Sequence, residues 1–90
     1  MKIEVEIPEY SIERGLPWIS EPGYRIQTFC RHEVITIQAN RAGLIFLARQ
    51  LLAMSQSSVP VGYHVHYDSM TSLEADSMEL IIEKSVKWEE

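Results

Sequence analysis

A helical period of apolar residues marks the stretch ANRAGLIFLARQLLAMSQSS, residues 39–58, while the flanking segments alternate. This change of period determines the predicted fold class. The recurrence at i, i+3, i+4, i+7 and i+8 is that of one helical stripe, made of Leu44, Leu47, Ala48, Leu51 and Leu52. Asn40 stands at the N-cap position, where its side-chain oxygen can accept a hydrogen bond from a free amide of the first turn. We therefore predict a helix over about 41–56.

Gly43 lies inside the first turn of this predicted helix. Glycine there costs helix propensity, on the order of 1 kcal/mol against alanine. Its presence therefore indicates that another backbone packs closely against the start of the helix.

Alternating segments precede and follow the helix. Residues 24–29 and 33–39 are rich in β-branched and aromatic residues, and the polar CRHE between them fits a hairpin turn. Residues 62–67 and 78–86 follow the helix with the same period of two. These four segments are predicted strands.

The N-terminal part combines one more alternating segment with a long loop. Residues 2–7 alternate apolar and charged side chains, which predicts a strand with one wet face. Residues 8–23 contain three prolines and two glycines, too broken for a regular element. Trp18 in this loop either covers the edge of the core or anchors a partner, and both interpretations stay open.

The element order is therefore β, loop, β, β, α, β, β, over residues 1–90. A chain this short has room for one core, so a single domain is expected. We predict an α+β fold: a sheet of about five mainly antiparallel strands, with one helix packed on one face. Leu73, in the polar connection before the last strand, is the expected apolar plug.

Composition narrows the function classes. Eight Lys and Arg against thirteen Asp and Glu give a net charge of −5, and without a basic cluster nucleic acid is not an expected partner. No run approaches the roughly 20 apolar residues of a membrane span, and the start has no signal-peptide pattern.

Cys30, the single cysteine, cannot form an internal disulfide. We expect a buried Cys30 in a cytoplasmic protein.

The stretch GYHVHYD, residues 62–68, raises the question of a metal site. His64 and His66 are two apart on a predicted strand and share a face, and Asp68 would continue the row. Zinc needs three or four converging ligands. The third ligand could be Asp68, His32 or Cys30. The alternative is an ordinary strand whose other face, with Tyr63, Val65 and Tyr67, is buried.

Enzyme signatures are absent from the sequence. It contains no glycine-flanked nucleophile turn, phosphate-binding glycine loop, HExxH or CxxC. We predict a protein that is not an enzyme and uses no cofactor.

On the last predicted strand Glu79 and Glu83 share a face, with Ile81 between them. This arrangement is either a solvated strand face or an acidic contact surface.

Residues 35–83 resemble the bacterial immunity protein 32 family of polymorphic toxin systems. The resemblance rests on ITIQANRAGLIFLARQLLAMS, with Asn40 and Gly43, and on YHVHYDSMTSLEADSMELIIEK, with its His-x-His-x-Asp strand, Leu73 and Ser77. It implies a small antitoxin-like protein that binds a cognate protein toxin and neutralises it by steric occlusion, without turning over a substrate.

Contact residues for such a partner can be chosen by residue type alone. They are Trp18, Tyr24, His64, His66, Glu79, Glu83 and Trp88. Two alternatives stay open. One is a metal-binding or metal-dependent enzyme module centred on His64, His66 and Asp68. The other is a homodimer that pairs through an exposed edge strand, residues 2–7 or 78–86.

Overall fold

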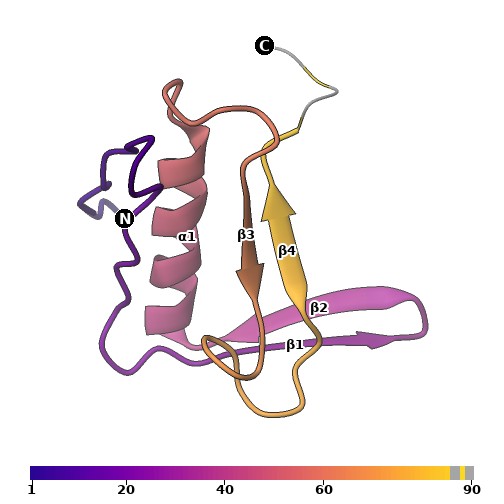
Figure 1. Ribbon diagram of the computed structural model, residues 1–90. Coiled ribbons are helices and arrows are strands. Elements are labelled where there is room, and N and C mark those ends of the chain that lie inside the picture. Colours follow the sequence, from indigo (N-terminus) through magenta and orange to yellow (C-terminus); the bar gives the residue numbers. More distant parts are fainter. Residues whose placement is uncertain (86–87, 89–90) are drawn as a thin grey trace.

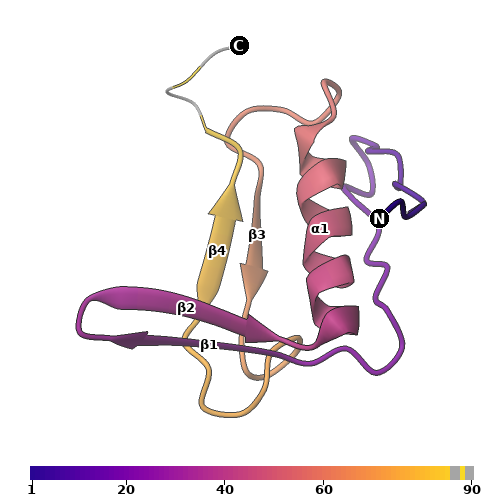
Figure 2. The same ribbon diagram turned by 180° about the vertical axis from the view of Figure 1, so that it is seen from behind.

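The computed structural model of the chain describes residues 1–85 and Trp88. Its elements, in chain order, are β1 (Ile26–Arg31), β2 (Val34–Ala39), α1 (Arg41–Ser55), β3 (His64–Tyr67) and β4 (Leu80–Glu83). Strands β1 and β2 form one antiparallel hairpin, and β3 and β4 form another. The β3–β4 hairpin stands beside α1, while the β1–β2 hairpin crosses near the base of α1 and projects beyond β4 (Figures 1 and 2).

The predicted five-stranded sheet is wrong, although the chain is a small α+β fold. The described residues form two separate two-stranded sheets, four strands in all. Residues 2–7 alternate as a strand does but form no ladder, and Ile3 is 49% exposed. Alternation describes the two faces of a strand; it does not supply a neighbour with which to pair. The last predicted strand is shortened to β4, and residue 86 lies outside the described residues.

The two sheets stay separate because an irregular segment occupies the second edge of β1. The amides of Glu74 and Met78 donate to the carbonyls of Ile26 (2.8 Å) and Thr28 (3.0 Å). The amide of Thr28 donates to the hydroxyl of Ser77 at 3.2 Å, and the Thr28 hydroxyl donates to the Met78 carbonyl. Isolated backbone bonds and side-chain bonds thus take the positions that a neighbouring strand would fill, so the ladder does not continue into β4.

The β1–β2 hairpin confirms the predicted turn. His32 and Glu33 have φ angles of 51° and 64°, and strand pairing starts at once with Arg31 opposite Val34. Positive φ at both central residues is the mark of the two-residue type I′ turn, whose twist suits a hairpin. The register that follows runs to Ile26 opposite Ala39.

The start of α1 also matches its prediction. The Asn40 side-chain oxygen accepts from the amides of Gly43 (2.8 Å) and Arg25 (3.0 Å), and its amide nitrogen donates to the Gly23 carbonyl (3.0 Å). A Cβ added to Gly43 would lie 2.5 Å from the Arg25 carbonyl oxygen. Asn40 therefore joins the helix to the chain entering β1, and the absence of a side chain at Gly43 permits this close approach.

The helix buries a different face from the predicted one. Its buried residues are Gly43, Phe46, Gln50, Ala53 and Met54. Leu44, Leu51 and Leu52, from the predicted stripe, are about half exposed, and only Leu47 packs against the core. The reason is the contact at Gly43, because the helix must turn this residue toward β1, and Phe46 and Gln50 then share its side.

The core lies where α1, β3 and the base of the β1–β2 hairpin meet. Its buried cluster consists of Ile26, Phe46, Tyr67 and Leu73, which confirms Leu73 as the apolar plug. The Tyr67 hydroxyl donates to the side-chain oxygen of buried Gln50 at 3.2 Å. Burial, together with nearby Tyr63, raises the pKa of Tyr67 to about 12.

Cys30 is exposed, contrary to its prediction as a buried residue. It lies near the end of β1, on the part of the hairpin that projects past the rest of the molecule (Figure 1). The core does not reach this far. Among the described residues, no helix is both long and apolar enough to cross a membrane.

Candidate functional site

The outward side of the β3–β4 hairpin brings together four of the residues selected from the sequence. We call it the outer β3–β4 face and define it as His64, His66, Glu79, Ile81 and Glu83. The strand register places His64 opposite Glu83 and His66 opposite Ile81. All five side chains are exposed, whereas Val65, Tyr67, Leu80 and Ile82 turn toward the core. This division follows from the period of two along each strand.

Hydrogen bonds orient both imidazoles on this face. The Nδ1 atom of His64 lies 3.1 Å from the Gly62 carbonyl, and that of His66 lies 3.1 Å from a carboxylate oxygen of Glu79. Both oxygens accept, so each Nδ1 is the donor, and among the described residues Nε2 is left for an external partner. The two rings meet edge to face, with centroids 5.1 Å apart.

The ion pair between His66 and Glu79 is exposed on both sides, with side-chain exposures of 49% and 54%. It is a charge pair only when the imidazole is protonated, and water screens it. It therefore contributes little to stability. Its main effect is to hold the carboxylate of Glu79 beside the ring, so that the face presents acceptors and imidazoles together.

Asp68 does not belong to this face, although it continues the His-x-His-x-Asp row in sequence. One carboxylate oxygen accepts from the amides of Met70 and Thr71 and from the Thr71 hydroxyl, each at 3.0 Å. Hydrogen bonds from the Thr71 side chain and the Met70 amide hold the pKa of Asp68 below its usual range. Asp68 therefore shapes the turn that leads to Leu73.

A metal site at His64, His66 and Asp68 finds no support in this geometry. Within residues 1–85 and Trp88, no group of three or more His, Cys, Asp or Glu side chains converges in a way that could hold a metal ion. One carboxylate oxygen of Asp68 is instead engaged by its own turn. Zinc requires three or four converging ligands, so two histidines alone are insufficient.

The remaining predicted contact residues lie away from the outer β3–β4 face. Trp18 packs against Phe46 and Tyr67, with ring centroids 5.0 and 5.8 Å apart, and is 48% exposed. Tyr24 stacks on Phe46 at 4.8 Å. Trp88 is exposed near the C-terminus. Trp18 thus covers the edge of the core while half of it faces solvent, and Tyr24 is mainly a packing residue.

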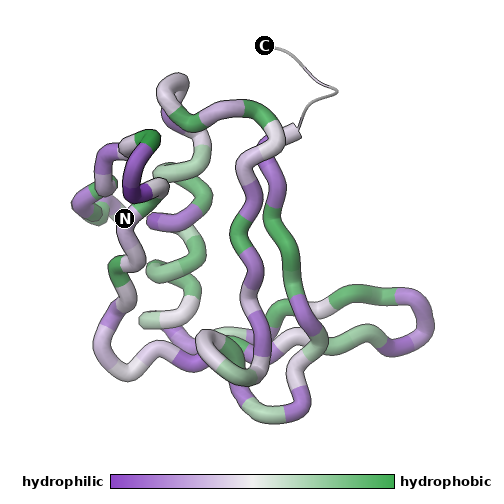
Figure 3. The backbone as a smooth tube through the Cα atoms, in the orientation of Figure 1, coloured by the Kyte–Doolittle hydropathy of each residue, from purple (hydrophilic) through white to green (hydrophobic). Residues whose placement is uncertain are grey.

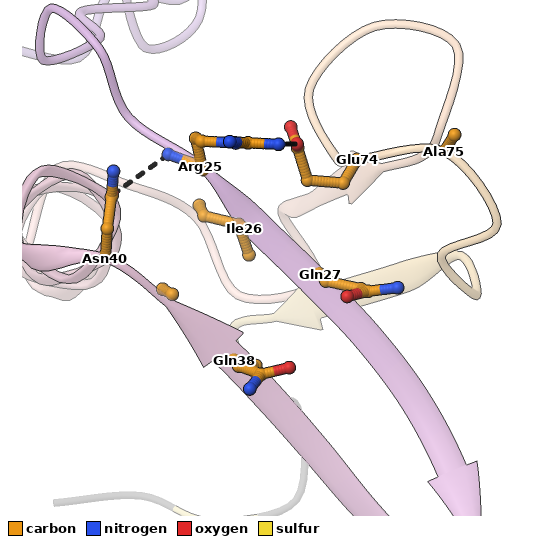
Figure 4. Close-up of a pocket in the computed structure, with 8 residues that line it drawn as sticks. Arg25, Ile26, Gln27, Gln38, Asn40, Glu74 and Ala75 are labelled. Carbon is orange, nitrogen blue, oxygen red and sulfur yellow. Dashed lines mark hydrogen bonds and ion pairs between the residues drawn. The ribbon is translucent and has the colours of Figure 1, made fainter.

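An open hollow of about 560 Å³ lies beside the base of the β1–β2 hairpin (Figure 4). Its charged groups and Asn40 are engaged within the chain. Arg25 donates to the Glu74 carboxylate at 2.6 and 2.8 Å, and the Asn40 side chain bonds the backbone of the entering chain. Gln27 and Gln38 also line the hollow, and their side-chain amides have no hydrogen-bond partner among the described residues, so a ligand would meet these two amides but no free charged group.

Ile81 is the member of the outer β3–β4 face that was not selected from the sequence. It is 50% exposed and lies between Glu79 and Glu83 on the same side of the hairpin. The signal was present, because a period of two already placed these three residues on one face. A choice by residue type, which favoured aromatic and ionisable side chains, omitted the aliphatic residue at the centre.

Comparison with known proteins agrees with the resemblance. The sequence model of the immunity protein 32 family matches residues 34–85, which include β2, α1, β3 and β4 but not β1 or the N-terminal segment. Searches of curated proteins and of solved structures gave no match. Since the matched range covers more than half of the chain, the chain belongs to the immunity protein 32 family.

Proposed function

We propose that the chain binds a cognate protein toxin and neutralises it by covering the toxin's active site, without turning over a substrate. Membership of the immunity protein 32 family is the observation that carries this proposal. The strands β3 and β4 lie within the matched residues, so the outer β3–β4 face belongs to the part of the chain that defines the family. The proposed place of action is the cytoplasm.

The outer β3–β4 face is the proposed contact surface, because an apolar centre is surrounded there by ionisable side chains. Ile81 is the centre, and His64, His66, Glu79 and Glu83 surround it. A small apolar anchor within a polar rim is the usual anatomy of a protein interface. The opposite side of this hairpin packs against the core, which holds the proposed contact surface in place.

Charge supports a basic toxin surface as the counterpart. The chain has a net charge of −5, and Glu79 and Glu83 add two carboxylates to the proposed contact. Opposite charges on two partners speed their encounter and favour the right orientation. Association should therefore slow as salt is added, because exposed charges are screened.

Protection of cells against the toxin encoded beside the gene tests this function. Ile81→Lys places a cation at the centre of the acidic face, and the exposed position lets the strand keep its fold. We expect the wild-type chain to restore growth and Ile81→Lys to weaken toxin binding tenfold or more, about 1.4 kcal/mol.

Ile12→Ala is the matched control, because Ile12 is highly exposed but lies in the N-terminal segment outside the matched residues. It should protect as the wild type does. A wild-type chain that neither binds nor protects would contradict the proposed function. A fully protective Ile81→Lys variant would contradict the proposed contact surface alone.

A further inference from the structure

Strand β2 has an uncharged outer edge that none of the described residues covers. Its six residues, VITIQA from Val34 to Ala39, include no Lys or Pro, and no bulge interrupts the register. Ile35 and Ile37 are 74% and 43% exposed. Figure 3 shows the same strand as a hydrophobic stretch that ends at the hydrophilic tip of the hairpin. Natural proteins usually protect such an edge with charge, proline or a covering segment.

The hairpin register determines which backbone groups face outward. The two-residue turn makes Arg31 and Val34 a hydrogen-bonded pair, so every second pair is bonded in the same way. The opposite edge agrees, because Ile26 and Thr28 point away from β2 and bond the 74–78 segment. The backbone amides and carbonyls of β2 that face outward are therefore those of Ile35, Ile37 and Ala39. No hydrogen bond joins these groups to another described residue.

We propose that β2 pairs antiparallel with β2 of a second copy of this chain, about a two-fold axis at Ile37. With Ile37 opposite Ile37 of the second copy, Ile35 faces Ala39 and Ala39 faces Ile35. All three outward-facing residues of each copy then exchange both backbone hydrogen bonds. The result is a four-stranded antiparallel sheet in the order β1, β2, β2, β1.

Charge selects this same register. Glu33 lies in the turn just before β2, and Arg41 is the first residue of α1, so neither belongs to the paired strands. In this register each Glu33 comes to the same end of the shared sheet as Arg41 of the other copy, where the two long side chains can meet. Both side chains belong to exposed residues. One ion pair between Glu33 and Arg41 thus forms at each end of the interface, which makes the edge self-complementary, as a two-fold interface requires.

Apolar exposure also decreases in this arrangement. Ile35 and Ile37 share the side of the hairpin that carries Ile26 and Ala39 into the core. Pairing places exposed Ile35 beside Ala39 of the second copy, at the start of its helix. Two exposed Ile37 side chains meet as a cross-strand pair, an arrangement that stabilises antiparallel sheets.

The mass of the purified full chain in solution tests the dimer. Sedimentation of the wild type should give twice the 10.4 kDa of one chain, with dissociation on dilution. Ile37→Lys puts two like charges directly opposite each other and should give a monomer. Ile81→Lys is the matched control, because Ile81 is similarly exposed on the other hairpin, and it should remain a dimer.

A charge exchange tests the register. Glu33→Arg should weaken the dimer, as should Arg41→Glu, and the double variant should restore it. Circular dichroism establishes that each variant is folded. A wild type that stays monomeric at every concentration overturns the proposal, as does an Ile37→Lys dimer. Single charge variants that weaken a dimer without rescue in the double variant overturn the register. The surface differs from the outer β3–β4 face, so loss of the dimer leaves the proposed function untouched.

Discussion

At the scale of single residues, the His-x-His-x-Asp row divides into two roles. His64 and His66 face outward and are held through their Nδ1 atoms, while Asp68 turns back on its own chain. The same sequence spacing thus serves a surface and a turn. This division could not be read from the spacing, because it depends on where β3 ends, at Tyr67.

Asp68→Ala should lower the urea midpoint of unfolding at about pH 7, and the loss should shrink below about pH 4. The hydrogen bonds from Thr71 and Met70 favour the ionised carboxylate and lower the pKa of Asp68 in the folded chain. A carboxyl with a lowered folded pKa adds stability above its unfolded pKa. That stability is lost as the pH falls through the folded value.

Asp68→Asn is the control for this prediction, because it keeps an oxygen at the same place but cannot ionise. It should lose less stability than the alanine variant. A loss in Asp68→Ala that is the same at neutral and acidic pH would show that the charge of the carboxylate has no part in holding the turn.

At the scale of elements, the start of α1 joins the end of β2, the first turn of the helix and the chain that enters β1. Asn40 bonds the first turn and the chain entering β1, and Gly43 lets the Arg25 carbonyl approach. The carbonyl of Arg25 in turn accepts from the backbone amide of Asn40 at 3.1 Å. Asn40 and Gly43 therefore hold the start of the helix against the chain that enters β1.

Gly43→Ala should destabilise the chain by about 1 to 2 kcal/mol, despite the better helix propensity of alanine. The added Cβ would lie 2.5 Å from the Arg25 carbonyl and 2.9 Å from Ile26, so the helix or the strand must move. Denaturant unfolding measures the change. Ala48→Gly, at an exposed position of the same helix, controls for propensity and should lose about 1 kcal/mol. A Gly43→Ala variant as stable as the wild type would contradict the close approach.

Apart from the strand wrongly predicted at residues 2–7, the local elements were predictable from the sequence, while their pairing was not. The hairpin turn, the N-cap and the faces of β3 and β4 each follow from a few neighbouring residues. The buried side of α1 does not, because Leu44 and Leu51 form as good a stripe as the true face. Only the long-range contact at Gly43 decides between the two.

At the scale of the whole molecule, the sheet was mispredicted because the irregular 74–78 segment replaces a strand beside β1, through the backbone of Glu74 and Met78 and the side chain of Ser77. Thr28 and Ser77 supply the side-chain bonds, and nothing in a period of two distinguishes them from strand residues. The consequence is a hairpin that projects from the core, with exposed Cys30 and Ile35. The outer β3–β4 face was more accessible to prediction, since alternation places His64 and His66 on one face of their strand and Glu79, Ile81 and Glu83 on one face of the next. Only the pairing of β3 with β4 brings the two sets together.

The most direct test of the account is an NMR titration of the isotope-labelled chain with the toxin encoded beside its gene. The methyl signals of Ile81 and the ring signals of His64 and His66 should change most on binding. The exposed methyl groups of Leu44 and Leu51, an apolar surface of α1 of similar exposure, should stay unchanged. No change at any signal would contradict the immunity function, and changes confined to the helix leucines would contradict the outer β3–β4 face as the site of contact.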